Sequence, residues 1–249
     1  MTQVSDFVAI DMGNTQIKIA HFFQKKIQKI DRISISELIS HPESIQNITN
    51  LSGIYCSVRS KEDNMAIEKL FPFIKNVENF QKLPIKNDYK SSTLGWDRLI
   101  NAIATNHLAK TAASLAIDIG TCIKFDLVVD NHYKGGSISP GLRLRFTSLN
   151  QLTANLPYTD DYSPVEYLAD NTIDAIRSGV INGAQGEINH FIRRYTEEYP
   201  SLTIFVTGGD AQYFDIESKN NIFVDENLTF IGLYQIYTFL HHQFFEQWL

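Results

Sequence analysis

Two short stretches of the chain place an acid, a glycine and a threonine in the same order. Asp11-Met12-Gly13-Asn14-Thr15 follows one apolar run, and Asp118-Ile119-Gly120-Thr121 follows another. A glycine has no Cβ, so main-chain N–H groups in such a turn can approach a ligand and form a concavity for phosphate oxygens. An acid such as Asp11 beside a phosphate implies that a metal ion or its water shell lies between them. Each stretch alone is also typical of an ordinary tight turn with a polar tip.

A second strand is predicted directly after each turn. Ile17, Ile19 and His21 alternate with Lys18 and Ala20, and the apolar residues Ile123, Phe125 and Leu127 occupy every second position of the other segment. Each motif therefore lies in a β-hairpin. Its repetition indicates a duplicated domain that clasps a nucleotide phosphate tail. The loops resemble those of the superfamily of acetate kinase, sugar kinases, Hsp70 and actin. The resemblance implies an α/β fold of two actin-like, ribonuclease H-like domains, 1–112 and 113–249. Each domain would hold a mixed sheet flanked by helices, with the nucleotide cleft between the halves.

A third chemical group precedes a predicted helix in the first half. Gly95-Trp96-Asp97-Arg98 leads into an apolar stripe that recurs with helical spacing through Leu108. Asp97 then stands at the helix N-terminus, where an acid stabilises the helix as an N-cap or through the helix dipole. The alternative is that Asp97 is a general base beside the polar segment 82–94, which is long enough to line a substrate. Arg98 is either a solvated neighbour or a ligand for a carboxylate.

The remaining elements alternate between strands and helices along the chain.

Three further residue groups each have two interpretations or an unexplained spacing. Gly208-Gly209 follows a strand, which is typical either of a tight turn or of a loop that accepts a nucleoside against bare backbone. Arg143 and Arg145 begin a helix, either as surface residues or as contacts to an anion or a partner subunit. The helix from Thr172 carries three glycines at near one-turn spacing, which close packing would explain. The predicted strands are 25–35, 53–58, 76–80, 134–139, 203–207 and 221–224, and the predicted helices are 36–44, 60–71, 97 onward, 142–156, 172 onward and 228–249.

Composition narrows the classes of function. The chain has 249 residues, a net charge of −6 and a pI near 5.6, which argue against nucleic acid as the main partner. Two cysteines provide no disulfide framework and favour a reducing compartment. We expect a cytoplasmic protein without a signal peptide, because Asp6 and Asp11 interrupt the first apolar run. We also expect no membrane segment, since histidines and glutamines interrupt the apolar region 228–245.

Five ordered blocks together resemble the type III pantothenate kinases, the Bvg accessory factor family. The blocks are Asp-Met-Gly-Asn-Thr at 11–15, Gly-Trp-Asp-Arg at 95–98, Asp-Ile-Gly-Thr at 118–121, Gly-Gly-Ser-Ile-Ser-Pro-Gly at 135–141 and Asn-Thr-Ile-Asp-Ala-Ile at 171–176. The resemblance implies an enzyme that phosphorylates pantothenate with ATP and Mg²⁺ in the first step of coenzyme A biosynthesis. It also implies a homodimer that requires K⁺ or NH₄⁺.

The resemblance assigns a role to individual residues of this chain. Asp97 would be the general base, Asp118 the ligand of the monovalent cation, and Asp11 the residue that organises Mg²⁺ indirectly. The helix from Thr172 would form the dimer contact. The implied ATP-binding residues are Asp11, Met12, Gly13, Asn14, Thr15, Gln16, Ile17, Lys18, Thr121, Gly208 and Gly209, and the implied pantothenate-binding residues are Tyr89, Gly95, Trp96, Asp97, Arg98 and Thr172.

Two positions depart from the family pattern. Trp96 stands where a small residue is usual, which predicts a narrower or differently lined pantothenate pocket. Lys124 stands where a hydroxyl residue is frequent, and it either contacts ATP phosphates or lies on the surface. Two other functions remain open at this level: a kinase for another small acceptor, and a non-catalytic, nucleotide-dependent module.

Overall fold

A computed structural model describes residues 7–13, 16–41, 51–216 and 221–246. The chain forms two compact units. The first unit contains residues 1–86, 93–104 and 228–249, and the second contains residues 87–92 and 105–227. Among the described residues, none of the helices combines the length and the apolar character that crossing a membrane demands.

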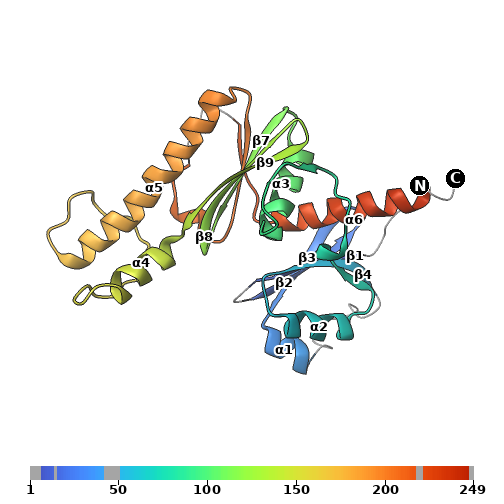
Figure 1. The fold of residues 1–249 in the computed structure, drawn as a ribbon. Helices are drawn as coiled ribbons and strands as arrows, with labels where there is room; N and C mark the ends of the chain where they lie inside the picture. The colour runs from blue at the N-terminus through green and yellow to red at the C-terminus, as the bar shows by residue number, and fades with distance from the viewer. Residues whose placement is uncertain (1–6, 14–15, 42–50, 217–220, 247–249) are drawn as a thin grey trace. The chain divides into compact units, whose positions relative to one another are not determined.

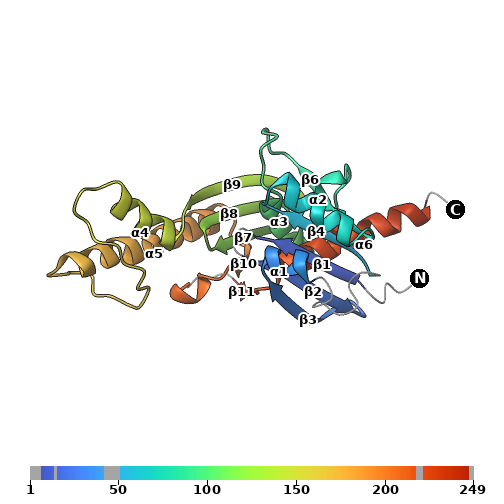
Figure 2. The same cartoon turned by 90° about the horizontal axis from the view of Figure 1, so that it is seen from below.

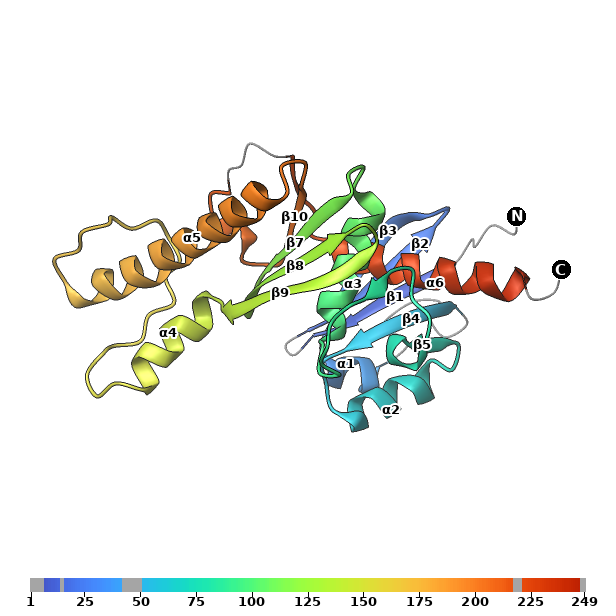
Figure 3. The same cartoon turned by 45° about the horizontal axis from the view of Figure 1, so that its top comes forward.

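The first unit is built on a five-stranded mixed sheet (Figure 3). Its spatial order is β3-β2-β1-β4-β5, with β1 antiparallel to β2 and parallel to β4. The strands are β1 (Phe7–Met12), β2 (Ile17–Phe23), β3 (Lys26–Ile33), β4 (Ser52–Ser57) and β5 (Ile74–Asn76), and the helices are α1 (Ile35–Ser40), α2 (Lys61–Leu70), the start of α3 (Trp96–Leu108) and α6 (Leu228–Glu246).

Strand β1 is buried on both faces, which explains its continuous apolar run. Val8, Ile10 and Met12 enter the core that Leu38 of α1 and Ile67 of α2 complete. On the other face, the Phe7 ring lies 5.6 Å from that of Tyr234 in α6. Helix α6 and the pair α1 and α2 therefore cover opposite faces of this sheet (Figure 1).

The second unit repeats this design. Its sheet has the order β11-β10-β7-β8-β9-β6 (Figure 2), with β7 antiparallel to β8 and parallel to β10. Helices α4 and α5 pack together, and both contribute to the core on one face of the sheet. The strands are β6 (Lys86–Asn87), β7 (Ala113–Ile119), β8 (Cys122–Val129), β9 (His132–Pro140), β10 (Thr203–Thr207) and β11 (Ile222–Val224), and the helices are α4 (Leu142–Gln151), α5 (Thr172–Glu198) and the short 3-10 turn η3 (Ala211–Tyr213). Another 3-10 turn, η2 (Val77–Asn79), belongs to the first unit.

The two sheets confirm the predicted duplication. Strands β3-β2-β1-β4-β5 of the first unit and β9-β8-β7-β10-β11 of the second have the same order and the same directions of pairing. The first acidic loop connects β1 with β2 and the second connects β7 with β8, as the repeated motif predicts. The predicted fold class, two mixed sheets flanked by helices, is confirmed.

Two predicted elements differ from the structure. The strand expected at 76–80 ends at Asn76, because the Asn76 side chain accepts a hydrogen bond of 3.0 Å from the main-chain N–H of Glu78 and starts η2. The helix expected at 142–156 ends at Gln151. Beyond it, the Thr153 hydroxyl donates to the carbonyl of Leu149 at 2.7 Å, and Leu152 is exposed instead of buried.

Helix α6 lies in the first unit although it ends the chain. Gly232 makes this packing possible, because a Cβ at that position would lie 2.2 Å from the main-chain oxygen of Ile100 in α3. The Thr229 hydroxyl also donates to the Asn101 side chain at 3.0 Å. The compact units therefore follow spatial contact, whereas the boundary expected at 112/113 followed the chain.

Candidate functional site

The acid of the first loop lies beside a buried thiol. Asp11 on β1 stands opposite Lys18 on β2 and is also in register with Cys56 on the parallel strand β4. The Cys56 thiol donates to Asp11 Oδ1 at 3.7 Å, and its side chain is only 3% exposed. No local sequence pattern selects Cys56, because the register of β1 with the distant strand β4 brings it to Asp11.

The charge of Asp97 also affects the pKa of the Cys56 thiol. Burial raises the pKa of the Cys56 thiol well above its usual value, and the negative charges of Asp11 and then Asp97 raise it further. The thiol therefore responds to both carboxylates, which places Asp11 and Asp97 in one neighbourhood of the first unit. A neutral thiol can donate a hydrogen bond without adding a third negative charge.

Asp97 is located in the first turn of α3, two residues after Gly95. The carbonyl of Gly95 accepts a hydrogen bond of 3.3 Å from the Leu99 N–H, so Gly95, and not Asp97, is the N-cap of α3. The carboxylate folds back against Gly95, because a Cβ there would lie 2.5 Å from Asp97 Oδ1. The predicted neighbours differ in burial: Trp96 is half-buried, and Arg98 is only 8% exposed. Arg98 is therefore not a solvated surface residue.

The rest of the first loop offers main chain to a ligand. The side chains of Met12 and Ile17 are fully buried in the core, so that only their backbone groups are available. Gly13 and Lys18 are half-buried, and Gln16 is exposed. The predicted ATP-binding residues Asn14 and Thr15 lie outside the described residues.

The acid of the second loop is ion-paired with a lysine. Asp118 on β7 stands directly opposite Lys124 on β8, and Lys124 Nζ lies 2.6 Å from Asp118 Oδ2. On its other side Asp118 is in register with Thr207 on β10. Lys124 is mostly buried, so the alternative of a surface lysine is excluded. Thr121, at the tip of the loop, is exposed.

Close backbone packing supports the second loop from two sides. A Cβ at Gly208 would lie 2.2 Å from the Ile119 oxygen, and Gly208 has a φ of +98°, which favours glycine. The Asp210 N–H donates to the same oxygen at 3.0 Å. On the other side, the Gly141 N–H donates to the Thr121 carbonyl at 3.0 Å. The turn at Gly208 and the loop at Thr121 thus form one assembly.

Asp210 is a second acid close to Asp118. Burial raises the pKa of the Asp210 carboxyl above its usual value, and the charge of Asp118 raises it further. Gly209 has open space where a Cβ would stand, which leaves its backbone accessible to a ligand. Sequence reasoning missed Asp210, although it directly follows the glycine pair.

The Tyr89 ring packs against Gly135 in the second unit. A Cβ at Gly135 would come within 3.2 Å of the Tyr89 ring, and the φ of Gly135 is +99°. The neighbouring Asp88 accepts hydrogen bonds from Lys134 at 2.6 Å and from His132 at 3.0 Å. These bonds hold the pKa of Asp88 below its usual value, the Lys134 bond having the larger effect. They also fasten the segment that contains Tyr89 to β9.

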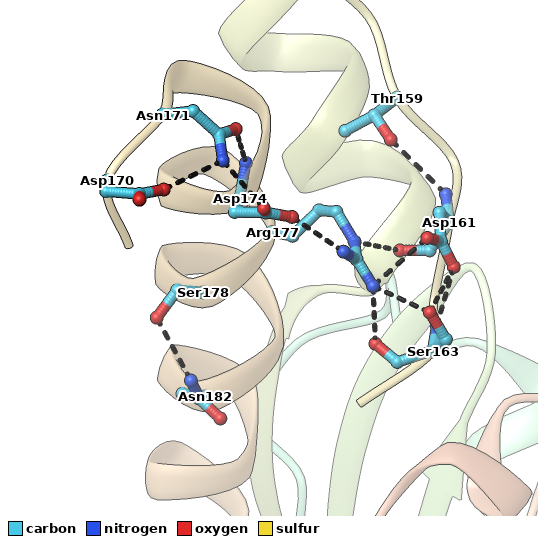
Figure 4. A network of polar contacts seen from close by, with 9 residues as sticks. All are labelled: Thr159, Asp161, Ser163, Asp170, Asn171, Asp174, Arg177, Ser178 and Asn182. Atoms are coloured by element: carbon cyan, nitrogen blue, oxygen red, sulfur yellow. Dashed lines mark hydrogen bonds and ion pairs between the residues drawn. The ribbon is translucent and has the colours of Figure 1, made fainter. Parts of the chain in front are cut away.

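Thr172 is exposed at the start of α5. It follows Asn171, whose contacts Figure 4 shows. The Asn171 side chain caps this helix by accepting the Asp174 N–H at 3.0 Å, as the capping pattern predicts. Arg177 donates to Asp174 at 2.7 Å and to the Ser163 hydroxyl at 2.6 Å. The loop before α5 is thereby attached to the helix in the second unit.

Arg145 of α4 forms hydrogen bonds within its own unit. It donates to Glu187 of α5 at 2.5 Å and to the Pro140 carbonyl at 2.7 Å. Arg145 therefore fastens α4 to α5 and to the end of β9.

The residues present fit a magnesium ion that is held mainly by phosphate and water. Mg²⁺ usually keeps several waters and binds through one or two carboxylates together with substrate phosphates. Asp11 supplies one half-buried carboxylate beside the backbone of Gly13. Among the described residues, no three His, Cys, Asp or Glu side chains are grouped as a metal site.

Comparison with known proteins agrees with these features. The family model of type III pantothenate kinase matches residues 7–194. A type III pantothenate kinase of Phocaeicola vulgatus is 36% identical, over 92% of this chain and 97% of that protein. Among solved structures, a Baf family protein of Campylobacter jejuni is similar with a TM-score of 0.62 and 18% identity, covering 94% of this chain and 99% of that one. MreB 5 of Spiroplasma citri is similar with a TM-score of 0.51 and 10% identity, covering 98% and 99%. The two structures show the shared actin-like fold, and the sequence matches show that this chain belongs to the type III pantothenate kinase family.

Proposed function

We propose that this chain transfers the γ-phosphoryl group of ATP to the hydroxyl of pantothenate, which yields 4'-phosphopantothenate in the first step of coenzyme A biosynthesis. The structural observation that supports this most directly is the pair of carboxylates around Cys56. Asp11 lies near the end of β1 and Asp97 lies in the first turn of α3, yet both raise the pKa of the Cys56 thiol. A kinase needs an acid for the metal and a base for the acceptor in such proximity.

In the proposed mechanism Asp97 is the general base. Its carboxylate accepts the proton of the pantothenate hydroxyl while the hydroxyl oxygen forms a bond to the γ-phosphorus. The bond between the γ-phosphorus and the β–γ bridging oxygen breaks, and ADP leaves. Magnesium supplies charge neutralisation at the phosphates when it is bound. Asp11 would hold that ion through its water shell, and the backbone amides from Gly13 to Lys18 would hold the phosphate oxygens.

The other site residues have positioning roles in this proposal. Arg98 binds the carboxylate of pantothenate, because a buried guanidinium presents a planar pair of donors to such a group. Gly95 leaves space for the Asp97 carboxylate. Tyr89, Trp96 and Thr172 complete the acceptor contacts, and Thr121, Gly208 and Gly209 complete the contacts to ATP.

A positive charge at Asp118 is a further part of the proposal. The family resemblance assigns this charge to K⁺ or NH₄⁺. In this chain Lys124 already places an ammonium group on the same carboxylate. We therefore propose that a monovalent positive charge beside the second loop supports ATP use.

We also propose that the chain acts as a homodimer through α5. A cavity of about 390 Å³ lies along this helix and is bounded by Tyr167 and Ala169 of the preceding loop and by Ala175, Gly179 and Gly183 of α5, among others. Among the described residues, and apart from chain neighbours and the backbone of the adjacent helix turns, no atom lies within 4 Å of a Cβ built at Gly179 or Gly183. Glycines inside a helix cost about 0.5–1 kcal/mol each relative to alanine, a cost that close packing with a second copy of α5 would offset.

A cytoplasmic location is proposed on the basis of the cysteines. Both Cys56 and Cys122 are free thiols, as is usual in reducing compartments.

The function is tested by incubating the chain with ATP, Mg²⁺ and pantothenate and detecting phosphopantothenate by mass spectrometry. Asp97→Asn serves as the control for contaminating kinase activity. A panel of sugars and short acids tests acceptor choice, and faster turnover of any of these than of pantothenate would overturn the proposed substrate. ATP binding without transfer to any acceptor would instead support a non-catalytic role.

A further inference from the structure

The ion pair between Lys124 and Asp118 bears on the monovalent cation. Their backbones are directly opposite in the β7–β8 ladder, so the pair is built into the hairpin. The ammonium nitrogen lies 2.6 Å from Asp118 Oδ2, a distance typical of a short charge-assisted hydrogen bond. The side chains are only 13% and 19% exposed. Water therefore screens this pair less than it screens a surface pair.

A free K⁺ ion bound at Asp118 would either lie beside the Lys124 ammonium, where the two positive charges repel each other, or displace that ammonium. Removing one member of a partly buried ion pair leaves the other charge uncompensated, which is strongly unfavourable. K⁺ would neutralise Asp118, but it has no proton to donate. The arrangement therefore favours lysine over a diffusible ion at this position.

The surrounding charges explain why a cation is useful there. Asp210 lies close enough to Asp118 for the Asp118 charge to raise the pKa of the Asp210 carboxyl. Two acids thus share the end of β7 and β10, next to the loop that contains Thr121. Lys124 offsets part of this negative charge, which would otherwise repel a triphosphate.

We propose that the Lys124 ammonium takes the place of the monovalent cation at Asp118, so that nucleotide binding by this chain does not depend on K⁺ or NH₄⁺. This inference rests on one part of the proposed function, namely that the chain binds ATP. It differs from the expectation drawn from the family resemblance, in which Asp118 binds a free ion.

The first experiment measures the affinity for Mg²⁺–AMPPNP by calorimetry at constant ionic strength, with K⁺, NH₄⁺ or tetramethylammonium as the cation. We expect the wild-type affinity to change by less than about twofold, well below the range of about 5–150-fold typical of coupled sites. Lys124→Thr should bind weakly in tetramethylammonium and regain affinity in K⁺ or NH₄⁺ by a factor within that range. Lys29→Thr is the control, because Lys29 forms a 2.6 Å ion pair with Asp31 on the edge strand β3. It should remain insensitive to K⁺.

A second measurement uses Tl⁺ as a substitute for K⁺ and detects binding by ²⁰⁵Tl NMR. We expect a bound signal for Lys124→Thr and none for the wild type. Lys124→Met, which keeps the side-chain length but removes the charge, replaces Lys124→Thr if the latter has no cooperative melting transition.

Two results would overturn the proposal: a wild-type affinity that K⁺ raises fivefold or more, or tight, K⁺-independent binding by the charge-removed variants. Neither readout requires an acceptor. Failure to phosphorylate pantothenate would therefore refute the proposed function without affecting this test.

Discussion

Gly95→Ala tests whether the position of the Asp97 carboxylate determines the rate of phosphoryl transfer. The new methyl group would lie 2.5 Å from Asp97 Oδ1, about 0.9 Å short of the 3.4 Å at which ordinary contact begins. The oxygen must therefore move by roughly that distance. It is the end of a flexible side chain, so that the helix itself need not shift.

The magnitude follows from the displacement. A misplacement of about 1 Å can cost on the order of 10²-fold in rate, which corresponds to about 2.7 kcal/mol of transition-state stabilisation. We expect kcat to fall by about that factor while the affinity for Mg²⁺–AMPPNP stays unchanged. An alanine in place of glycine at a helix N-cap changes stability by only about 1 kcal/mol. The melting temperature should therefore decrease by only a few degrees, about 2–4 °C for a chain of this size.

The assay compares Gly95→Ala, Asp97→Asn and the double variant. If Gly95→Ala acts through Asp97, it should have little further effect once the carboxylate is absent, and the two losses should not add. Wild-type kcat in Gly95→Ala would refute the reasoning. Full additivity in the double variant would also refute it, because the alanine would then act through another group.

Three further predictions concern single residues. Asp97→Asn should lower kcat by about 10²–10⁴-fold, because an amide cannot accept the hydroxyl proton, and a near-normal kcat would leave Asp97 only a structural role. Asp210→Asn should raise the melting temperature at pH 7–8: the carboxyl has a raised pKa in the folded state, so its ionisation opposes folding above that pKa. The gain should shrink towards about pH 4, where the unfolded state is also protonated, and a gain independent of pH would contradict this cause. Gly232→Ala should destabilise the protein by about 1–3 kcal/mol by urea unfolding, because its Cβ would lie 2.2 Å from the Ile100 oxygen; unchanged stability would show that α6 adjusts freely.

The sequence by itself determined the hairpins, the duplication and the family. Each acidic loop is a local pattern of strand, acid, glycine and second strand, and hairpin register follows from residues close in the chain. The Asn171 cap is likewise local, since the side chain bonds the N–H of Asp174 three residues later. Such features need no knowledge of distant contacts.

The relation of Asp97 to Asp11 was decided only by the tertiary structure. Asp11 meets Cys56 through parallel pairing of β1 with β4, and no local pattern specifies which residues of distant strands become neighbours. Asp97 is positioned by α3. The last helix of the chain, α6, contacts α3 closely at Gly232, although the two helices are far apart in the sequence. These contacts cannot be predicted from local sequence, because they arise from tertiary packing and not from helix or strand propensity.

Lys124 illustrates the same division within one hairpin. Its sequence position is compatible with a surface residue or with a phosphate contact. The strand period places Asp118 and Lys124 on one face of the sheet, and burial of that face then makes pairing with Asp118 the favourable way to keep the ammonium charged. The residues were evident from the sequence, whereas the low exposure that gives their charges strong mutual attraction is a property of the folded sheet.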